Sequence, residues 1–289
     1  MEFLEILKII LLGIVEGITE WLPVSSTGHM ILLNHFLPLT NVSEAFIDMF
    51  EYVIQLAAIL AVVVIFWKRI FPIDIKTNTL NENGVSKKLQ LGWKKDILSM
   101  WLKVVIACIP AVLALAIDTL FSKLSPTTET AIISATLILY GVAFLLVETF
   151  NKSEPKIKEI SQLSYRYAFF IGCIQVLAAV PGTSRSGITI LGALLLGVSR
   201  TAAAEFTFFL AIPTMVGSSA YKLLKFFLDR NVMSAPEIGY LIIGSLVAFA
   251  LSLFAVKFLM NFVKKHDFKV FGWYRIGLGA IVLLTLLFL

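Results

Sequence analysis

Two short polar segments interrupt otherwise apolar sequence, and their residue types are those of an anion-binding, catalytic site. The first spans residues 23–29, and Glu16 and Glu20 precede it. The second spans residues 181–187 and contains Arg185. Because a lipid bilayer penalises ionised side chains and interrupted helical backbone, such residues in an apolar chain indicate a functional site.

Each polar segment is expected to start a short helix whose N-terminus faces an anion. Pro23 and Pro181 should end the preceding helices, since the residue before a proline avoids helical geometry. Hydroxyl side chains cap helix N-termini, and the free N–H groups there bind anions. Two such ends that meet would suit an anion with two phosphates. The predicted substrate-binding residues are Ser25, Thr27, Gly28, Gly182, Ser184, Ser186, Gly187 and Thr189.

The charged and nucleophilic side chains suggest individual roles. Arg185 offers a rigid fork of donors for phosphate oxygens. Glu16 and Glu20 share one helix face, where like charges repel, so we expect them to be partly protonated, to bind a cation or to face Arg185. Each arrangement suits proton transfer or metal-assisted phosphate chemistry. Ser26 is the candidate nucleophile, with Glu20 as base or metal ligand. His29, three residues after Ser26, is expected on the same side of the short helix as a stabilising group or proton donor.

Further polar residues in apolar segments are predicted to support this site. Glu51 and Gln55 lie one helical turn apart in the following apolar segment. Glu205 occupies the equivalent place in the second half of the chain, and Gln175 matches Glu16. We interpret these four residues as lining the cavity or contacting its catalytic side chains.

Composition places the chain in a membrane. Of its 289 residues, 58% are hydrophobic and 15% are charged, and the mean hydropathy is +0.91, whereas soluble domains carry about 25% charged residues. The net charge of +5 resides mainly in loops and does not indicate nucleic acid binding. Cys108 and Cys173 are interpreted as buried small apolar residues, without disulfide or zinc spacing. Glu2 and Glu5 argue against a cleavable signal peptide.

The apolar segments predict an all-α integral membrane protein with about six transmembrane helices and two re-entrant helical hairpins. Spans near the ~20 residues that cross a bilayer are expected around 46–67, 97–121, 130–150, 201–222, 238–262 and 273–289. The hairpins are expected at 3–37 and 166–198, because their second arms, 28–37 and 188–198, are too short to cross alone.

This order predicts an inverted repeat. Residues 1–150 would form one hairpin and three spans, and residues 151–289 the second copy, which an odd number of crossings inverts. Lysine and arginine gather in loops 68–96, 151–165 and 263–272, which places those loops in the cytoplasm. Loops 122–129 and 223–237 would lie outside, together with both termini, and the hairpins would enter from opposite faces and meet near mid-membrane.

The polar segments and their surroundings resemble the undecaprenyl-diphosphate phosphatase family of the bacitracin-resistance type. The motifs read EGITEWLPVSSTGH at 16–29 and PGTSRSGIT at 181–189. Supporting stretches read FEYVIQL at 50–56 and GVSRTAAAEF at 197–206. The resemblance covers essentially the whole chain, and the polar positions of both motifs show no departure.

The resemblance implies an enzyme of the bacterial cytoplasmic (inner) membrane that removes one phosphate from undecaprenyl diphosphate. The product is the monophosphate lipid carrier of peptidoglycan synthesis, and the reaction confers tolerance to bacitracin. It further implies a site open to the outer side and a divalent cation, Mg²⁺ or Ca²⁺, for which Glu16 and Glu20 are candidate ligands.

Other readings of the residues remain open. Inverted repeats and charges at mid-membrane also suit a transporter or flippase of a phosphorylated polyprenyl lipid. A small-anion channel would have no use for a nucleophile beside its anion site. The spacing does not separate a phosphoserine intermediate at Ser26 from direct attack by water. Gly141, Gly239 and Gly244 would allow close helix contacts, either within one chain or in a homodimer.

Overall fold

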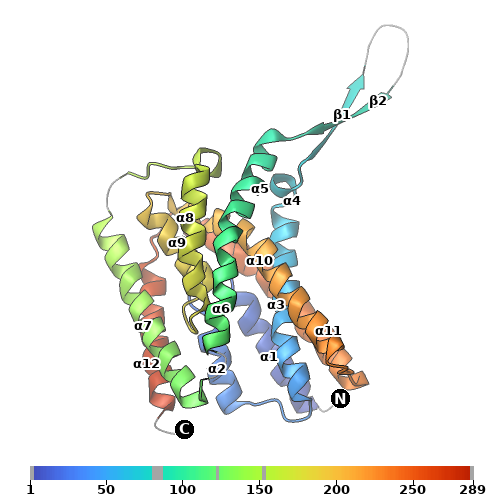
Figure 1. Cartoon of the computed structure of the whole chain (residues 1–289), viewed down its shortest axis with the longest axis vertical. Coiled ribbons are helices and arrows are strands. Elements are labelled where there is room, and N and C mark those ends of the chain that lie inside the picture. The colour runs from blue at the N-terminus through green and yellow to red at the C-terminus, as the bar shows by residue number, and fades with distance from the viewer. Residues whose placement is uncertain (1–2, 80–86, 122–123, 152–153, 287–289) are drawn as a thin grey trace.

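The computed structural model describes residues 3–79, 87–121, 124–151 and 154–286. It is a bundle of helices with one projecting β-hairpin (Figure 1). The helices are α1 (Phe3–Thr19), α2 (Ser26–Phe36), α3 (Glu44–Ile65), α4 (Trp67–Ile70), α5 (Lys95–Cys108), α6 (Val112–Phe121), α7 (Pro126–Phe150), α8 (Tyr165–Gln175), α9 (Arg185–Leu195), α10 (Arg200–Leu228), α11 (Ala235–Phe262) and α12 (Lys269–Thr285). Three 3-10 turns join them: η1 (Ile109–Ala111), η2 (Ile160–Gln162) and η3 (Val176–Ala179).

Five helices in the described part of the chain are long and apolar enough to cross a membrane. They cover Glu44–Ile65, Lys95–Ala114, Pro126–Phe150, Arg200–Leu228 and Ala235–Phe262, which confirms a multi-pass helical membrane protein. The second of these spans continues through η1, where Pro110 lacks the N–H that a regular helix needs. The sixth predicted span, 273–289, corresponds to α12, which has 17 residues; residues 287–289 lie outside the described part.

The segment predicted as loop 68–96 contains secondary structure that the sequence analysis missed. Strands β1 (Ile73–Thr79) and β2 (Lys87–Trp93) pair antiparallel, with Ile73 opposite Trp93. The sequences IDIKTNT and KKLQLGW alternate apolar or β-branched residues with polar ones, which is the period of a β-strand. The many lysines of this segment are typical of a loop beside a membrane, although its residues also alternate as strands do.

The two pairs of short helices lie toward opposite ends of the bundle. Figure 1 shows α1 and α2 toward the end that holds both termini, whereas α8 and α9 lie toward the end from which the β-hairpin projects. The two pairs meet where Arg185, the first residue of α9, bonds to Glu20, the residue that follows α1. The two interruptions of helix, between α1 and α2 and between α8 and α9, therefore lie next to each other in space.

Glycines let helices pack closely at three places. A Cβ on Gly13 would lie 2.8 Å from the Gly244 carbonyl oxygen, which shows how closely α1 packs on α11. In the same way Gly172 of α8 packs against Ala107 of α5, and Gly141 of α7 against α12. Gly141 and Gly244, considered above as helix-contact residues, thus both serve contacts within one chain.

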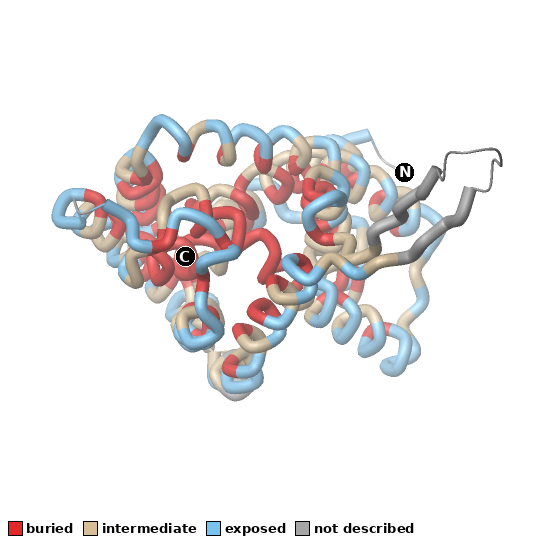
Figure 2. The backbone as a smooth tube through the Cα atoms, turned by 90° about the horizontal axis from the view of Figure 1, so that it is seen from above, coloured by how far each residue is buried: buried red, intermediate tan, exposed pale blue. Residues whose placement is uncertain are grey.

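Buried residues fill the centre of the bundle, and exposed residues form its outer faces (Figure 2). One prediction is corrected here: Cys173 is exposed and Cys108 half-buried. Because the outer face of a membrane helix is apolar too, an apolar neighbourhood in sequence does not separate lipid-facing from core positions.

Candidate active site

Both short helices begin with a serine in an unusual backbone conformation. Ser25 has φ 72° and Ser184 has φ 68°, a region that residues with a Cβ rarely adopt. Each serine is the N-cap of its helix: Ser25 Oγ accepts from the Gly28 N–H at 3.3 Å, and Ser184 Oγ accepts from the Gly187 N–H at 3.1 Å. The two N-termini that the sequence predicted are therefore built alike, and backbone strain of this kind concentrates at functional sites.

Glu20 joins the two polar segments. Its Oε2 accepts a hydrogen bond from Ser26 Oγ at 2.8 Å, and its Oε1 accepts one from Arg185 Nη2 at 2.5 Å. Arg185 also donates through Nη1 to Thr214 Oγ1 of α10, at 3.2 Å. The side chain of Glu20 is 9% exposed and that of Arg185 is 21% exposed. A carboxylate so placed can accept the serine proton, while the guanidinium next to it can bind phosphate oxygens.

A cavity of about 250 Å³ opens beside Ser26. Glu16, Glu51 and Gln55 line it together with Thr27 of α2; Glu51 and Gln55 are two of the four residues that were expected there. It also receives Met30, Ile31, Asn34 and Glu129. Glu16 is buried, and its Oε1 has no hydrogen-bond partner among the described residues. An orphaned buried carboxylate oxygen beside the candidate nucleophile can bind water, a proton or a cation.

His29 turns to a different neighbour than expected. Its Nε2 is 2.7 Å from Tyr274 Oη and its Nδ1 is 2.7 Å from the Ser25 carbonyl oxygen. Since a carbonyl only accepts, Nδ1 carries the proton in this arrangement, and a neutral imidazole then accepts a hydrogen bond from the Tyr274 hydroxyl at Nε2. The lining of the cavity beside Ser26 includes neither His29 nor Glu20 nor Arg185; His29 lies against α12.

The hydroxyls of the second segment mostly hold the backbone in place. Ser186 Oγ donates to the Leu22 carbonyl at 3.3 Å, which ties the second segment to the first. Thr189 Oγ1 donates to the Arg185 carbonyl at 2.8 Å and is itself the acceptor of Thr207. Gly182, with φ +80°, leaves no room for a side chain, because a Cβ would lie 2.3 Å from Thr136 Oγ1.

For two residues of the predicted supporting set, the described part of the chain shows no hydrogen bond or ion pair to this site. Glu205 forms an ion pair with Arg69 of α4. Gln175 is buried at the end of α8, and its Oε1 has no partner among the described residues. The matches Glu51–Glu205 and Glu16–Gln175 are thus matches of position in each half of the chain, and only the first member of each pair borders the cavity beside Ser26.

A residue that the sequence analysis did not single out lies beneath both segments. Arg275 of α12 is completely buried. It donates to the carbonyl oxygen of Pro23 in the first segment and to those of Gly182 and Thr183 in the second. The signal was available in the sequence, since an arginine within an apolar segment invites the same question as Arg185.

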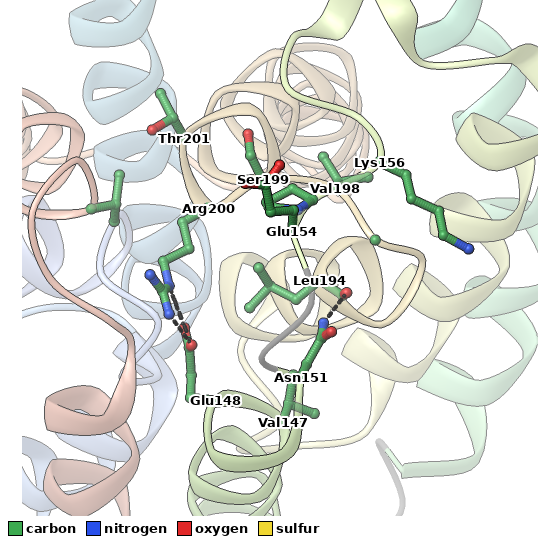
Figure 3. Close-up of a pocket in the computed structure, with 13 residues that line it drawn as sticks. Val147, Glu148, Asn151, Glu154, Lys156, Leu194, Val198, Ser199, Arg200 and Thr201 are labelled. Carbon is green, nitrogen blue, oxygen red and sulfur yellow. Dashed lines mark hydrogen bonds and ion pairs between the residues drawn. The ribbon is translucent and has the colours of Figure 1, made fainter.

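A larger cavity, of about 550 Å³, lies elsewhere (Figure 3). It is bordered by the end of α7 and the start of α10, where Arg200 bonds Glu148 through both carboxylate oxygens. Asn151 donates to the Leu194 carbonyl at 3.0 Å on another wall. None of its lining residues belongs to the two polar segments, so its size does not make it the catalytic cavity.

The donor chemistry near Ser26 suits a hard divalent cation. Such ions take carboxylate oxygens and water, and Glu16 supplies an unpaired buried oxygen. Within the described residues, however, no three His, Cys, Asp or Glu side chains are grouped closely enough to hold a metal on their own. A cation here would complete its ligand shell with water or with oxygens of the substrate.

The chain matches one known protein family and several named relatives over nearly its whole length. Residues 9–281 match the family described as bacitracin resistance protein BacA. A protein from Enterococcus faecalis named undecaprenyl-diphosphatase is 54% identical over 286 residues, covering 98% of each chain. Proteins of the same name from Desulfitobacterium hafniense and Lachnoclostridium phytofermentans are 52% and 51% identical, each match covering 98% of this chain and 97% of the relative.

Proposed function

Because this chain belongs to the bacitracin resistance protein BacA family, we propose that it hydrolyses undecaprenyl diphosphate to undecaprenyl phosphate and inorganic phosphate. The relatives that match nearly its whole length carry the name of that activity. The observation that supports the chemistry is Glu20, which holds Ser26 and Arg185 on its two carboxylate oxygens. A base, a nucleophile and a phosphate-binding cation are the parts that phosphoryl transfer needs.

In the proposed reaction, Ser26 Oγ attacks the terminal phosphorus while its proton passes to Glu20. The bond between phosphorus and the bridging oxygen breaks, and undecaprenyl phosphate leaves with the bonding electrons. The leaving phosphate takes the proton from Glu20, which is then ionised again. Water attacks the phosphoserine and gives a proton to Glu20; the bond between phosphorus and Ser26 Oγ breaks, inorganic phosphate leaves, and Oγ takes the proton back from Glu20. In the alternative that the residues leave open, Glu20 deprotonates a water that attacks phosphorus directly, and Ser26 orients that water.

Arg185 would change partners when substrate binds. In the structure its guanidinium bonds to Glu20. A diphosphate carries more charge and more acceptor oxygens than one carboxylate, so it competes for the guanidinium. Glu20 then loses its counter-ion and becomes a stronger base toward Ser26. Substrate binding would thereby activate the base only when the phosphate is in place.

The two helix N-termini would hold the remaining oxygens. Free N–H groups of the first turns of α2 and α9 point at an anion between them. Thr27 would add a hydroxyl at the wall of the cavity, while Ser184 and Ser186 fix the start of α9 through their bonds to the Gly187 N–H and the Leu22 carbonyl. His29, which accepts a hydrogen bond from Tyr274, would contribute the dipole of its neutral ring beside the start of α2; it would become a stabilising charge or a proton donor only after it takes up a proton at Nε2.

A divalent cation, Mg²⁺ or Ca²⁺, would be held by Glu16 together with the diphosphate oxygens, with Glu20 as the second candidate ligand. Its chemistry would be charge neutralisation on the phosphates. Glu51 and Gln55 lie in the same cavity, where they would hold the water around such an ion.

For the membrane arrangement we propose six spans and two re-entrant hairpins in an inverted repeat. Its support is the packing: the first arm of each hairpin lies against the second span of the other half, through Gly13 on α11 and Gly172 on α5. Residues 154–156 and Val263 border one cavity, so two of the three basic loops lie together, on the proposed cytoplasmic side. The cavity beside Ser26 would then open to the outer side of the bacterial cytoplasmic membrane, and its product would return the carrier to peptidoglycan synthesis.

The test is phosphate release by purified protein. In detergent with Mg²⁺, the protein should release inorganic phosphate from farnesyl diphosphate, and Ser26→Ala should lower kcat by about 10³-fold or more, as loss of a nucleophile does. Ser43→Ala, which removes the cap of α3 and a bond to Glu237 at a residue outside the lining of the cavity, is the control. Absence of release by the unaltered protein, with transport of a fluorescent prenyl phosphate across vesicles instead, would favour the flippase.

A further inference from the structure

A buried arginine connects the two catalytic segments from behind. The Nη1 of Arg275 donates to the Pro23 carbonyl at 3.3 Å, while Nη2 donates to the carbonyls of Gly182 and Thr183 at 3.1 and 3.0 Å. The first of these carbonyls precedes α2 and the other two precede α9. One rigid guanidinium thus contacts both broken-helix segments, although some 160 residues separate them.

Within the described part of the chain, Arg275 has no carboxylate partner. None of the ion pairs between described residues includes it; carbonyl oxygens surround it, and the Tyr140 ring centroid lies 5.8 Å from its Cζ. Its Nε lacks a hydrogen-bond partner in the described part of the chain. A buried charge without a counter-ion is expensive, and leucine or methionine would fill such a position more cheaply.

The guanidinium of Arg275 lies next to the start of α9, where the proposed substrate would bind. A Cβ on Gly187 would lie 3.2 Å from Arg275 Nη1, so the guanidinium borders the first turn of α9, close to Arg185 along the chain. The neighbouring residue, Tyr274, bonds to His29 of α2. Consecutive residues of α12 therefore contact both helices whose N-termini face the proposed substrate.

We propose that Arg275 is a positioning residue for the hydrolysis: it holds the N-terminal turns of α2 and α9 in register, so that Ser26 and Arg185 act on one diphosphate. This inference rests on the proposed function. It follows from geometry, because displacement of reacting groups by about 1 Å can lower a rate about 10²-fold. Lysine keeps the charge but presents a single nitrogen, whereas the planar guanidinium serves both segments at once.

The experiment compares Arg275→Lys and Arg275→Met with the unaltered protein in the farnesyl diphosphate assay. Thr136→Val is the matched control, since Thr136 donates to the Pro181 carbonyl and so contacts one segment without joining the two. We expect kcat to fall about tenfold or more for Arg275→Lys and about 10²-fold or more for Arg275→Met. KM should change less than about threefold in the lysine variant, and Thr136→Val should keep kcat within about threefold.

Folding is separated from positioning by gel filtration and a thermal melt, with rates divided by the monodisperse fraction. If Arg275→Met does not fold, Arg275→Lys alone decides. Turnover of the lysine variant equal to that of the unaltered protein would overturn the proposal, as would a rise in KM with unchanged kcat. Either result leaves the phosphatase activity standing, whereas an inactive unaltered protein removes the proposed function itself.

Discussion

Replacing Glu20 with glutamine should slow catalysis and tighten substrate binding at the same time. Glutamine keeps the size of the side chain and can still accept a hydrogen bond from Ser26, but it cannot take the proton. It also removes the carboxylate that competes with phosphate for Arg185. The two consequences act on different kinetic constants, and this separates the proposed role of Glu20 from a purely structural one.

The magnitudes follow from the geometry. A positioned general base contributes about 10²- to 10⁴-fold to a rate, so kcat should fall by that factor, equivalent to about 3–5 kcal/mol of activation free energy. The Arg185–Glu20 pair is partly buried, at 21% and 9% side-chain exposure, and its competition with substrate is worth about 1 kcal/mol after screening. KM should therefore fall about fivefold.

The assay is phosphate release from farnesyl diphosphate at saturating Mg²⁺, with kcat and KM fitted separately. Glu205→Gln is the matched control, because Glu205 is also a buried glutamate paired with an arginine, Arg69, yet lies away from Ser26. Its kcat should stay within about threefold of the unaltered protein. The reasoning is refuted if Glu20→Gln retains kcat within threefold, or if its KM rises as kcat falls.

Two further changes probe the surroundings of the site. Gly182→Ala should destabilise the folded protein by about 2 kcal/mol or more, and so lower the thermal midpoint and the yield, because the residue has φ +80° and its Cβ would meet α7. Gly217→Ala is the control, since a Cβ there would have nothing within 4 Å and should leave the midpoint unchanged. An equal midpoint for both variants would contradict the close approach at Gly182. Tyr274→Phe should lower kcat about threefold to tenfold, since it removes one hydrogen bond to His29 worth about 1 kcal/mol. Trp273→Phe, at the exposed neighbouring residue, is the control. A kcat for Tyr274→Phe equal to that of the unaltered protein would exclude a role for the tyrosine.

Helix positions and the two breaks could be read from sequence because they depend on local physics. Runs of apolar residues predict spans, and proline, glycine and serine predict where a helix stops and restarts. The pairing of Glu20 with Arg185 was among the expected arrangements, since two opposite charges in an apolar interior must find partners. Helical spacing put Glu51 and Gln55 on one face of one helix, and both line the cavity beside Ser26; that Glu16 of another helix lines the same cavity is a result of the packing.

What could not be read from sequence depends on how helices face one another. Spacing put His29 on the side of Ser26, but α2 has the cavity on one flank and α12 on the other, and the histidine turns to Tyr274. Glu205 matches Glu51 in the order of elements, yet Glu205 forms an ion pair with Arg69. The lysines around β1 and β2 concealed a strand period. In each case a tertiary neighbour decided what local spacing left open.

The twinned serines at the two helix starts argue for selection by geometry rather than by stability. Glycine would adopt φ near 70° without strain, whereas serine there costs about 1 kcal/mol or more. A serine cap is more stable than a glycine cap by only a few tenths of a kcal/mol, so stability alone does not favour serine. In both segments the next residue is a reactive one, Ser26 after Ser25 and Arg185 after Ser184, and both bond to Glu20. The unusual backbone turns each of these side chains toward the same carboxylate. We infer that the capping oxygen and the turned backbone are both required, and that serine is the small residue that provides them together.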